Sequence, residues 1–196
     1  MVLLQAFGPS LWLADGPEVS FFTFPYPTRM AVARLPRDSC SNDNNNDTEN
    51  DGLWVWSPVE LTPELEAEIT ALGTPRHIVS PNKLHHLYVK DWLDRWPTAK
   101  LHSPPGLARR RPDLHFEADE LGDVSHPAWA AGIDQVVFRG SFALEEVVFF
   151  HRLSRTVIFG DLLQRLDPAT MTGFRGWLMR MDGLVGEEGS TPREWR

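Results

Sequence analysis

Strand-like and helix-like segments alternate between residues 53 and 102, and this alternation limits the chain to a layered α/β fold. Residues 53–56 and 77–79 are apolar, β-favouring runs. Between them Thr62 fits a helix N-cap, Pro63 the first helical position, and Gly73 a helix end. Strands that alternate with helices are typical of βαβ units with a parallel sheet.

The alternation continues after the second strand. Tyr88, Trp92 and Trp96 recur every four residues, which predicts a helix over residues 84–96 with an aromatic core face. A short strand is predicted at 99–102.

The second half of the chain holds two further apolar runs, 147–150 and 156–160. They predict strands buried on both faces, joined by a turn over 151–155. Beyond them, Asp167 predicts the cap of a helix that ends at Gly183.

The first forty residues contain short β-favouring runs separated by prolines, which suit edge strands and hairpins. Residues 39–52 are almost wholly polar and rich in asparagine, so we expect a mobile insertion there. Residues 186–196 lack an apolar pattern and predict an irregular tail. A chain of 196 residues otherwise fits one domain, 1–196.

Charge and composition narrow the partners. Twenty-seven acidic and nineteen basic residues give a net charge of -8, which disfavours nucleic acid and anionic membranes. The basic triplet at 109–111 is a local exception, either a solvated turn or an anion contact. The single cysteine, Cys40, cannot form an intramolecular disulfide, and residues 1–5 lack the basic flank of a secretion signal. We therefore expect a soluble, cytoplasmic protein.

Histidine and carboxylate side chains stand where the apolar runs end. His85 and His86 follow the 77–79 run. His151 follows the 147–150 run, and Asp161 follows the 156–160 run. Side chains at strand ends commonly build metal or catalytic sites. Simpler roles stay open, because the histidine pair could cap a helix and His151 could be a turn residue.

Asp161 also has simpler roles. It could cap a following helix or pair with Arg152 or Arg155. The sequence has no glycine-rich nucleotide loop, no Gly-x-Ser-x-Gly elbow and no His-Glu-x-x-His helix, which disfavours nucleotide binding and serine hydrolysis.

Four segments carry a family resemblance: WVWSP at 54–58, HIVSPNKLHH at 77–86, FFHRLSRT at 149–156 and GDL at 160–162. They resemble an uncharacterised, domain-of-unknown-function branch of the metallo-β-lactamase-like superfamily. The resemblance implies an α/β fold, the metallo-β-lactamase-like αββα sandwich, with its site at one edge of the sheets. The superfamily's last metal histidine lies on later strands, so the resemblance implies a sandwich that is incomplete in its C-terminal half.

The superfamily's first metal motif, Thr-His-x-His-x-Asp-His, matches this chain from Ser80. Pro81 and Lys83 then stand at two histidine positions, His85 at the aspartate, and His86 at the last histidine. Lys83 would place a positive charge where a cation normally binds.

Two further residues match the superfamily's pattern. His151 resembles its next metal-binding histidine, and Asp161 resembles its metal-bridging aspartate. The resemblance thus implies metal ligands His85, His86, His151 and Asp161, with Asp161 and Lys83 as catalytic residues.

The function implied is a metal-dependent hydrolase with a degenerate site that holds one zinc or iron ion and acts on a small molecule. The alternative is a non-catalytic binding or scaffold protein that keeps the fold without a metal. A homo-oligomer, or a partner that covers the incomplete C-terminal half, is a further expectation.

Overall fold

The computed structural model describes residues 3–21, 24–36, 52–140, 144–169, 173–181, 183–186 and 189–193. The polar insertion predicted at 39–52 lies outside the described residues except for Gly52, as does part of the tail at 186–196. The described residues include no helix of the length and apolar character needed to cross a membrane.

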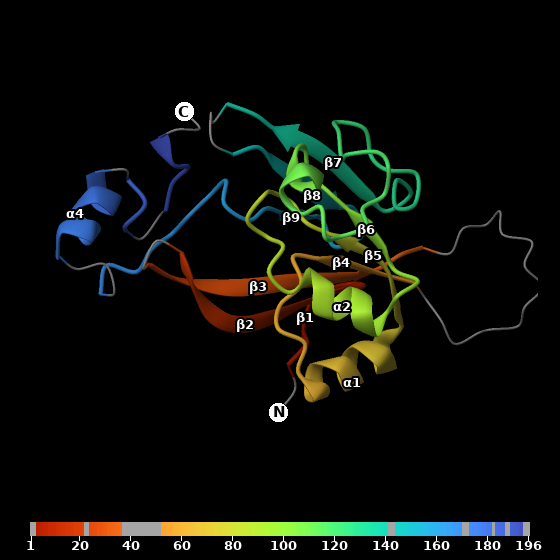
Figure 1. Cartoon of the computed structure of the whole chain (residues 1–196). Coiled ribbons are helices and arrows are strands. Elements are labelled where there is room, and N and C mark those ends of the chain that lie inside the picture. The colour runs from red at the N-terminus through yellow and green to blue at the C-terminus, as the bar shows by residue number, and fades with distance from the viewer. Residues whose placement is uncertain are drawn as a thin grey trace, which may run out of the picture.

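Six strands form the first sheet, in chain order from edge to edge (Figure 1). They are β1 (Gln5–Gly8), β2 (Leu11–Phe21), β3 (Phe24–Arg34), β4 (Gly52–Trp56), β5 (Thr74–Val79) and β6 (Lys100–His102). Strands β1 to β4 pair antiparallel, whereas β4, β5 and β6 pair parallel. The prolines thus do not prevent a long β2–β3 hairpin, and the predicted βαβ units are present.

Helices α1 (Pro63–Leu72), α2 (Val89–Arg95) and α3 (Leu107–Arg110) connect and follow these strands. The hydroxyl of Thr62 accepts the backbone N–H of Leu65, and α1 ends at Gly73, as predicted. Helices α1 and α2 bury Leu65, Ile69 and Trp92 in an apolar cluster shared with one face of the first sheet.

The other face of the first sheet packs on a second, antiparallel sheet of β7 (Ile133–Phe138), β8 (Glu146–His151) and β9 (Thr156–Ile158). Aromatic side chains join the two sheets. The ring of Trp54 on β4 lies 6.3 Å from that of Trp129 and 5.0 Å from that of Phe149 on β8, both edge-on. Strands β2 to β5 therefore point one row of side chains at the helices and the other at the second sheet.

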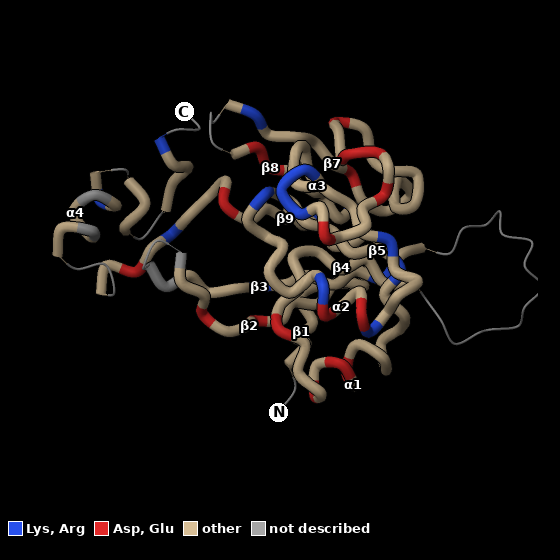
Figure 2. Tube along the Cα trace, in the orientation of Figure 1, with Lys and Arg blue, Asp and Glu red and all other residues tan. Residues whose placement is uncertain are grey.

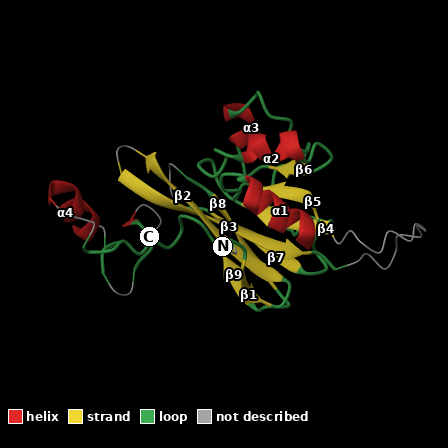
Figure 3. Cartoon of the chain, turned by 90° about the horizontal axis from the view of Figure 1, so that it is seen from below, coloured by secondary structure: helices red, strands yellow, loops and turns green. Residues whose placement is uncertain are grey.

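Figure 3 shows α1, α2 and α3 on one side of the molecule, the second sheet on the other, and α4 (Gly173–Met181) set apart. Within the described residues, helices thus cover only the first sheet, which gives three layers of the predicted four-layer sandwich. The outer face of the second sheet exposes Val136 and Val157 at 49% and 53%. The prediction that its strands are buried on both faces is wrong, because this covering layer is not among the described residues.

Two other local predictions are corrected. Strand β7 was not predicted at all. Helix α2 begins at Val89 rather than at Leu84, because the Asn82 side chain accepts the backbone N–H of Leu84 at 2.8 Å and holds residues 80–88 as a loop. This loop carries the histidine pair.

Candidate active site

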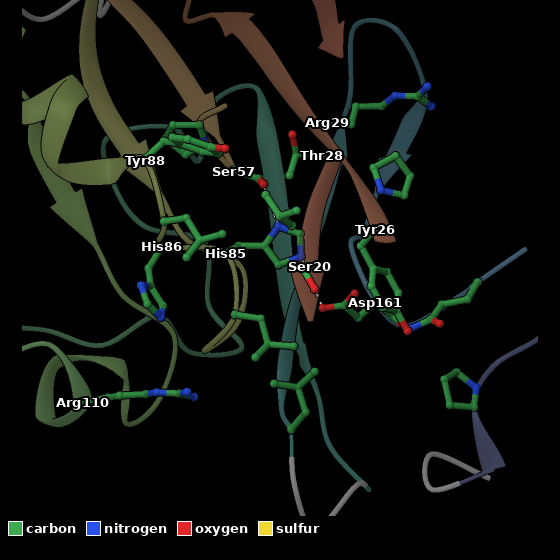
Figure 4. A pocket seen from close by; sticks show the side chains of 18 residues that line it. Ser20, Tyr26, Thr28, Arg29, Ser57, His85, His86, Tyr88, Arg110 and Asp161 are labelled. Atoms are coloured by element: carbon green, nitrogen blue, oxygen red, sulfur yellow. Dashed lines mark hydrogen bonds and ion pairs between the residues drawn. The ribbon is translucent and has the colours of Figure 1, made fainter. Parts of the chain in front are cut away.

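A pocket of about 410 Å³ opens where the carboxyl ends of β4 and β5 meet the β2–β3 hairpin (Figure 4). The loop after β5 and the segment after β9 complete its wall. Apolar side chains line much of it, and Ser57, His85 and Asp161 lie together on one side. The βαβ order therefore places a set of polar groups at the edge of the sheets.

Ser57 directly follows β4 and has a left-handed backbone conformation, with φ of 51°. Its backbone N–H donates to the carbonyl of Val79 at 2.9 Å, which ties the end of β4 to that of β5. Its Oγ lies 2.6 Å from Nδ1 of His85.

The other nitrogen of the His85 ring, Nε2, lies 3.2 Å from Oδ2 of Asp161. Both side chains are about one-fifth exposed, at 22% and 21%. The amide of Asn82 donates to the same Asp161 oxygen at 2.8 Å. Serine, imidazole and carboxylate thus form one continuous polar chain.

Behind this chain lies Glu146, whose side chain is completely buried. It accepts the backbone N–H groups of Gly160 and Asp161, each at 2.6 Å, and the Asn82 amide at 3.2 Å. Val147 donates its backbone N–H to the carbonyl of Pro81 at 2.8 Å. These bonds fasten the loop after β5 to the second sheet and hold Asp161 at His85.

The ionisation of the pair follows from this arrangement. Burial lowers the pKa of His85, but the hydrogen bond and charge of Asp161, with the charge of Glu146, outweigh it and raise the pKa above 6.5. Burial raises the pKa of Asp161, but His85 and Asn82 outweigh it and lower the pKa below 3.8. Burial raises the pKa of Glu146 in spite of its two backbone hydrogen bonds. Asp161 is therefore a carboxylate that orients His85.

The structure places the other predicted site residues elsewhere. His86 faces the pocket margin, with its Nδ1 2.8 Å from the guanidinium of Arg111. His151 lies at the far end of β8 from Glu146, with its Nδ1 2.7 Å from Oγ of Ser154. Lys83 lies against Gly106 in the loop before α3.

Of the four predicted metal ligands, the structure brings together only His85 and Asp161. Across the residues that it describes, no three His, Cys, Asp or Glu side chains are placed to hold a metal ion. Neighbouring residues in a loop point their side chains in different directions, which separates His86 from His85, and the length of β8 separates His151 from the pocket. The donor set therefore does not fit a zinc or iron ion, which needs three or more protein ligands.

The remaining alternatives are also settled by contacts. Residues after Asp161 do not form a helix, so Asp161 is not an N-cap, and Arg152 pairs with Asp134 instead. The basic triplet lies at the C-terminal end of α3 (Figure 2). Arg111 pairs with Asp113 at 2.6 Å, while the exposed side chain of Arg110 lines the pocket.

Three polar members of the site were not predicted from the sequence: Ser57, Asn82 and Glu146. Each stands at a strand end or in the loop that follows one, which is the signal that identified the histidines. Serine and asparagine are common at turns, and Glu146 begins a strand instead of ending one, so position alone did not single them out.

No protein-family model matches the chain, and no curated protein matches it in sequence. Solved structures do match its fold. DIM-1 metallo-β-lactamase exposed to ceftazidime has a TM-score of 0.56 at 11% identity, over 83% of this chain and 71% of that one. Metallo-β-lactamase IND-7 has a TM-score of 0.57 at 6% identity, over 97% of this chain and 91% of that one.

A third match is the metal-soaked Flv1 flavodiiron core from Synechocystis sp. PCC6803, with a TM-score of 0.55 at 7% identity. It covers 84% of this chain and 41% of that one. These neighbours share their fold with most of this chain. The chain has the metallo-β-lactamase fold.

Proposed function

We propose that this protein is a hydrolase that acts on a small molecule in the pocket, with His85 as general base and Asp161 as the residue that orients it. The observation that carries the proposal is the contact between His85 Nε2 and Asp161 Oδ2 in the pocket wall. A histidine held by a carboxylate and open to a cavity is a common general base.

The tautomer of His85 follows from its neighbours. An ionised carboxylate only accepts hydrogen bonds, so Nε2 carries the proton that faces Asp161. Neutral His85 then has its lone pair on Nδ1, on the side of Ser57. The ring can therefore take a proton from a nucleophile at Nδ1 and later return it to a leaving group.

The pocket and the fold support the class of reaction. A cavity of about 410 Å³ falls within the range of roughly 300–1,000 Å³ that is usual for small-molecule sites. Two of the structural neighbours are metallo-β-lactamases. The sequence resemblance suggested a metal, but His85 and Asp161 alone do not make up a zinc or iron site. The proposal therefore assigns the proton transfers to His85.

The test is hydrolysis of a panel of chromogenic probes by the purified chain: p-nitrophenyl esters, a thioester and the β-lactam nitrocefin. We expect turnover of at least one probe, with kcat/KM lowered about 10²-fold or more by His85→Gln and by Asp161→Asn. His115→Gln, an exposed histidine outside the pocket, should hydrolyse the probe like the wild type. No turnover of any probe, or turnover that both site variants retain, would overturn the proposal and favour a non-catalytic binding protein.

A further inference from the structure

We infer that Ser57 is the nucleophile of this hydrolase, so that the reaction passes through an acyl-enzyme and the substrates are carboxylic esters or thioesters. The inference rests on the proposed function and deepens it by naming the attacking atom and the substrate class. It also reverses the sequence-based expectation, which disfavoured serine hydrolysis because the Gly-x-Ser-x-Gly motif is absent.

The first support is the contact between Ser57 and His85. Oγ of Ser57 lies 2.6 Å from Nδ1, the nitrogen that the Asp161 carboxylate leaves unprotonated. The hydroxyl therefore donates to the imidazole, which is the contact that activates a serine. Serine, histidine and aspartate with these roles recur on unrelated folds, so the arrangement is recognised by geometry rather than by sequence order.

The second support is the backbone of Ser57. A φ of 51° is unfavourable for a residue with a Cβ, and such conformations cluster at functional sites. Here it turns the chain sharply at the end of β4, while the bond from the Ser57 N–H to Val79 fixes the turn. The backbone therefore leaves the direction of the strand at Ser57, and the hydroxyl lies at His85.

The reaction follows in two balanced steps. Ser57 Oγ bonds to the substrate carbonyl carbon while its proton passes to Nδ1 of His85; the carbon–oxygen or carbon–sulfur bond then breaks, and the leaving group takes that proton. Water next attacks the acyl carbon, gives a proton to Nδ1, and Oγ leaves with the proton that His85 returns. No other reactant is needed.

Charge on the substrate carbonyl oxygen would have to be stabilised by side chains. The Ser57 N–H is committed to Val79, and the next residue, Pro58, has no N–H. Two phenols line the same pocket, Tyr26 and Tyr88, and burial raises the pKa of both, which keeps their hydroxyl groups protonated. Neutral hydroxyl donors of this kind suit an ester oxygen.

The lining also indicates the acyl group. Val19, Leu84, Leu87 and Leu144 border the pocket that Ser57 faces. Apolar surface of this kind suits an aliphatic acyl chain.

The chain contains a matched control for the nucleophile. Ser154 Oγ lies 2.7 Å from Nδ1 of His151, nearly the same contact as that of Ser57, but neither residue lines the pocket. Burial lowers the pKa of His151, with no carboxylate opposing it. A reagent that reacts covalently with activated serines should therefore label Ser57 and not Ser154.

The experiment treats the full chain with a fluorophosphonate, with and without EDTA, and measures the adduct by intact-protein and peptide mass spectrometry. We expect one adduct, on Ser57, formed equally in both conditions and in Ser154→Ala. Ser57→Gly should form none, and because glycine accepts a φ of 51° without strain, this variant should fold like the wild type. His85→Gln should react with the fluorophosphonate at least about 10²-fold more slowly than the wild type.

Hydrolysis of the p-nitrophenyl ester by the same variants separates the two proposals. Loss in both Ser57→Gly and His85→Gln, with a burst of p-nitrophenol in the wild type, supports the acyl-enzyme. Full activity in Ser57→Gly with loss in His85→Gln would overturn the inference but leave the proposed hydrolase, with water as nucleophile. An adduct on Ser154 or on both serines would also overturn it.

Discussion

Two adjacent histidines take different roles in this molecule. His85 turns into the pocket between Ser57 and Asp161, whereas His86 turns toward Arg111 at the pocket margin. The sequence identified the pair but could not separate its members, because side-chain directions in a loop have no fixed period. It also gave Asp161 as a candidate site residue, and the structure places this carboxylate beside His85.

The charge of Asp161 should be visible in the pH dependence of hydrolysis. His85 acts as a base only when neutral, and its pKa lies above 6.5, so kcat/KM of the wild type should rise with pH through a pKa above that value. Asp161→Asn removes the charge that raises this pKa and should move the rise to lower pH. It should also lower kcat about 10²-fold or more, since an amide can donate to Nε2 and move the proton to Nδ1.

The measurement is the pH–rate profile of both proteins on the same p-nitrophenyl ester. An unchanged position of the rise in Asp161→Asn would show that His85 is not the group that titrates.

At the scale of elements, the segments with a strong local signal were predicted well. Helix α1 has its cap, its first proline and its terminal glycine in sequence, and β4 has an uninterrupted apolar run. Strand β5 begins at Thr74, three residues before the predicted run at 77–79. The predicted start of α2 was wrong because residues 80–88 form other bonds. The Asn82 side chain accepts the N–H of Leu84, and the N–H of His86 donates to the carbonyl of Leu84, two residues back, instead of four as in a helix. Helix α4 begins at Gly173 rather than after Asp167, and its Phe174 is 73% exposed.

The turn after β9 should be sensitive to a single methyl group. A Cβ built at Gly160 would lie 2.9 Å from Nε2 of His85, closer than real Cβ atoms approach. Gly160→Ala should therefore displace the ring from Asp161 and lower kcat/KM at least about tenfold. Gly122→Ala is the control, because a Cβ there meets nothing within 4 Å.

Ester hydrolysis together with thermal unfolding checks this prediction. A Gly160→Ala protein as active as Gly122→Ala would mean that His85 is not held by this turn.

The whole molecule contains a second histidine group, His77, His102 and His126, between the first sheet and the loop before β7. His77 Nδ1 lies 3.0 Å from His102 Nε2, and the His126 ring stacks on Trp129. Burial, followed by the charges of the neighbouring histidines, lowers the pKa of His77 to about 4 and that of His102 to about 3. Nδ1 of His102 is buried without a hydrogen-bond partner, so a proton there would find no acceptor.

These pKa values predict loss of stability in acid. Both histidines take up protons near pH 6.5 once unfolded but only near pH 4 and 3 in the folded state. The contribution of these two histidines to the free energy of unfolding is therefore fully present above pH 6.5 and is lost as the pH drops below that value. Each such group steepens the fall by up to about 1.4 kcal/mol per pH unit.

Urea unfolding between pH 7 and pH 4 tests this, with His102→Gln compared to His115→Gln. We expect a shallower fall in His102→Gln only. Parallel curves for the two variants would show that the buried histidine does not couple stability to pH.

The candidate active site spans the boundary between the two sheets. Ser57 and His85 follow strands of the first sheet, whereas Glu146 begins β8 and Asp161 follows β9 of the second, and hydrogen bonds from Asn82 and His85 join the two parts. Activity consequently reports whether the sheets are docked, not only whether each is folded. We expect ester hydrolysis to be lost at a lower urea concentration than far-ultraviolet circular dichroism, with near-ultraviolet tryptophan signals following activity. A substitution distant from the pocket that loosens the Trp54–Phe149 contact would then lower the proposed ester hydrolysis while the strands persist.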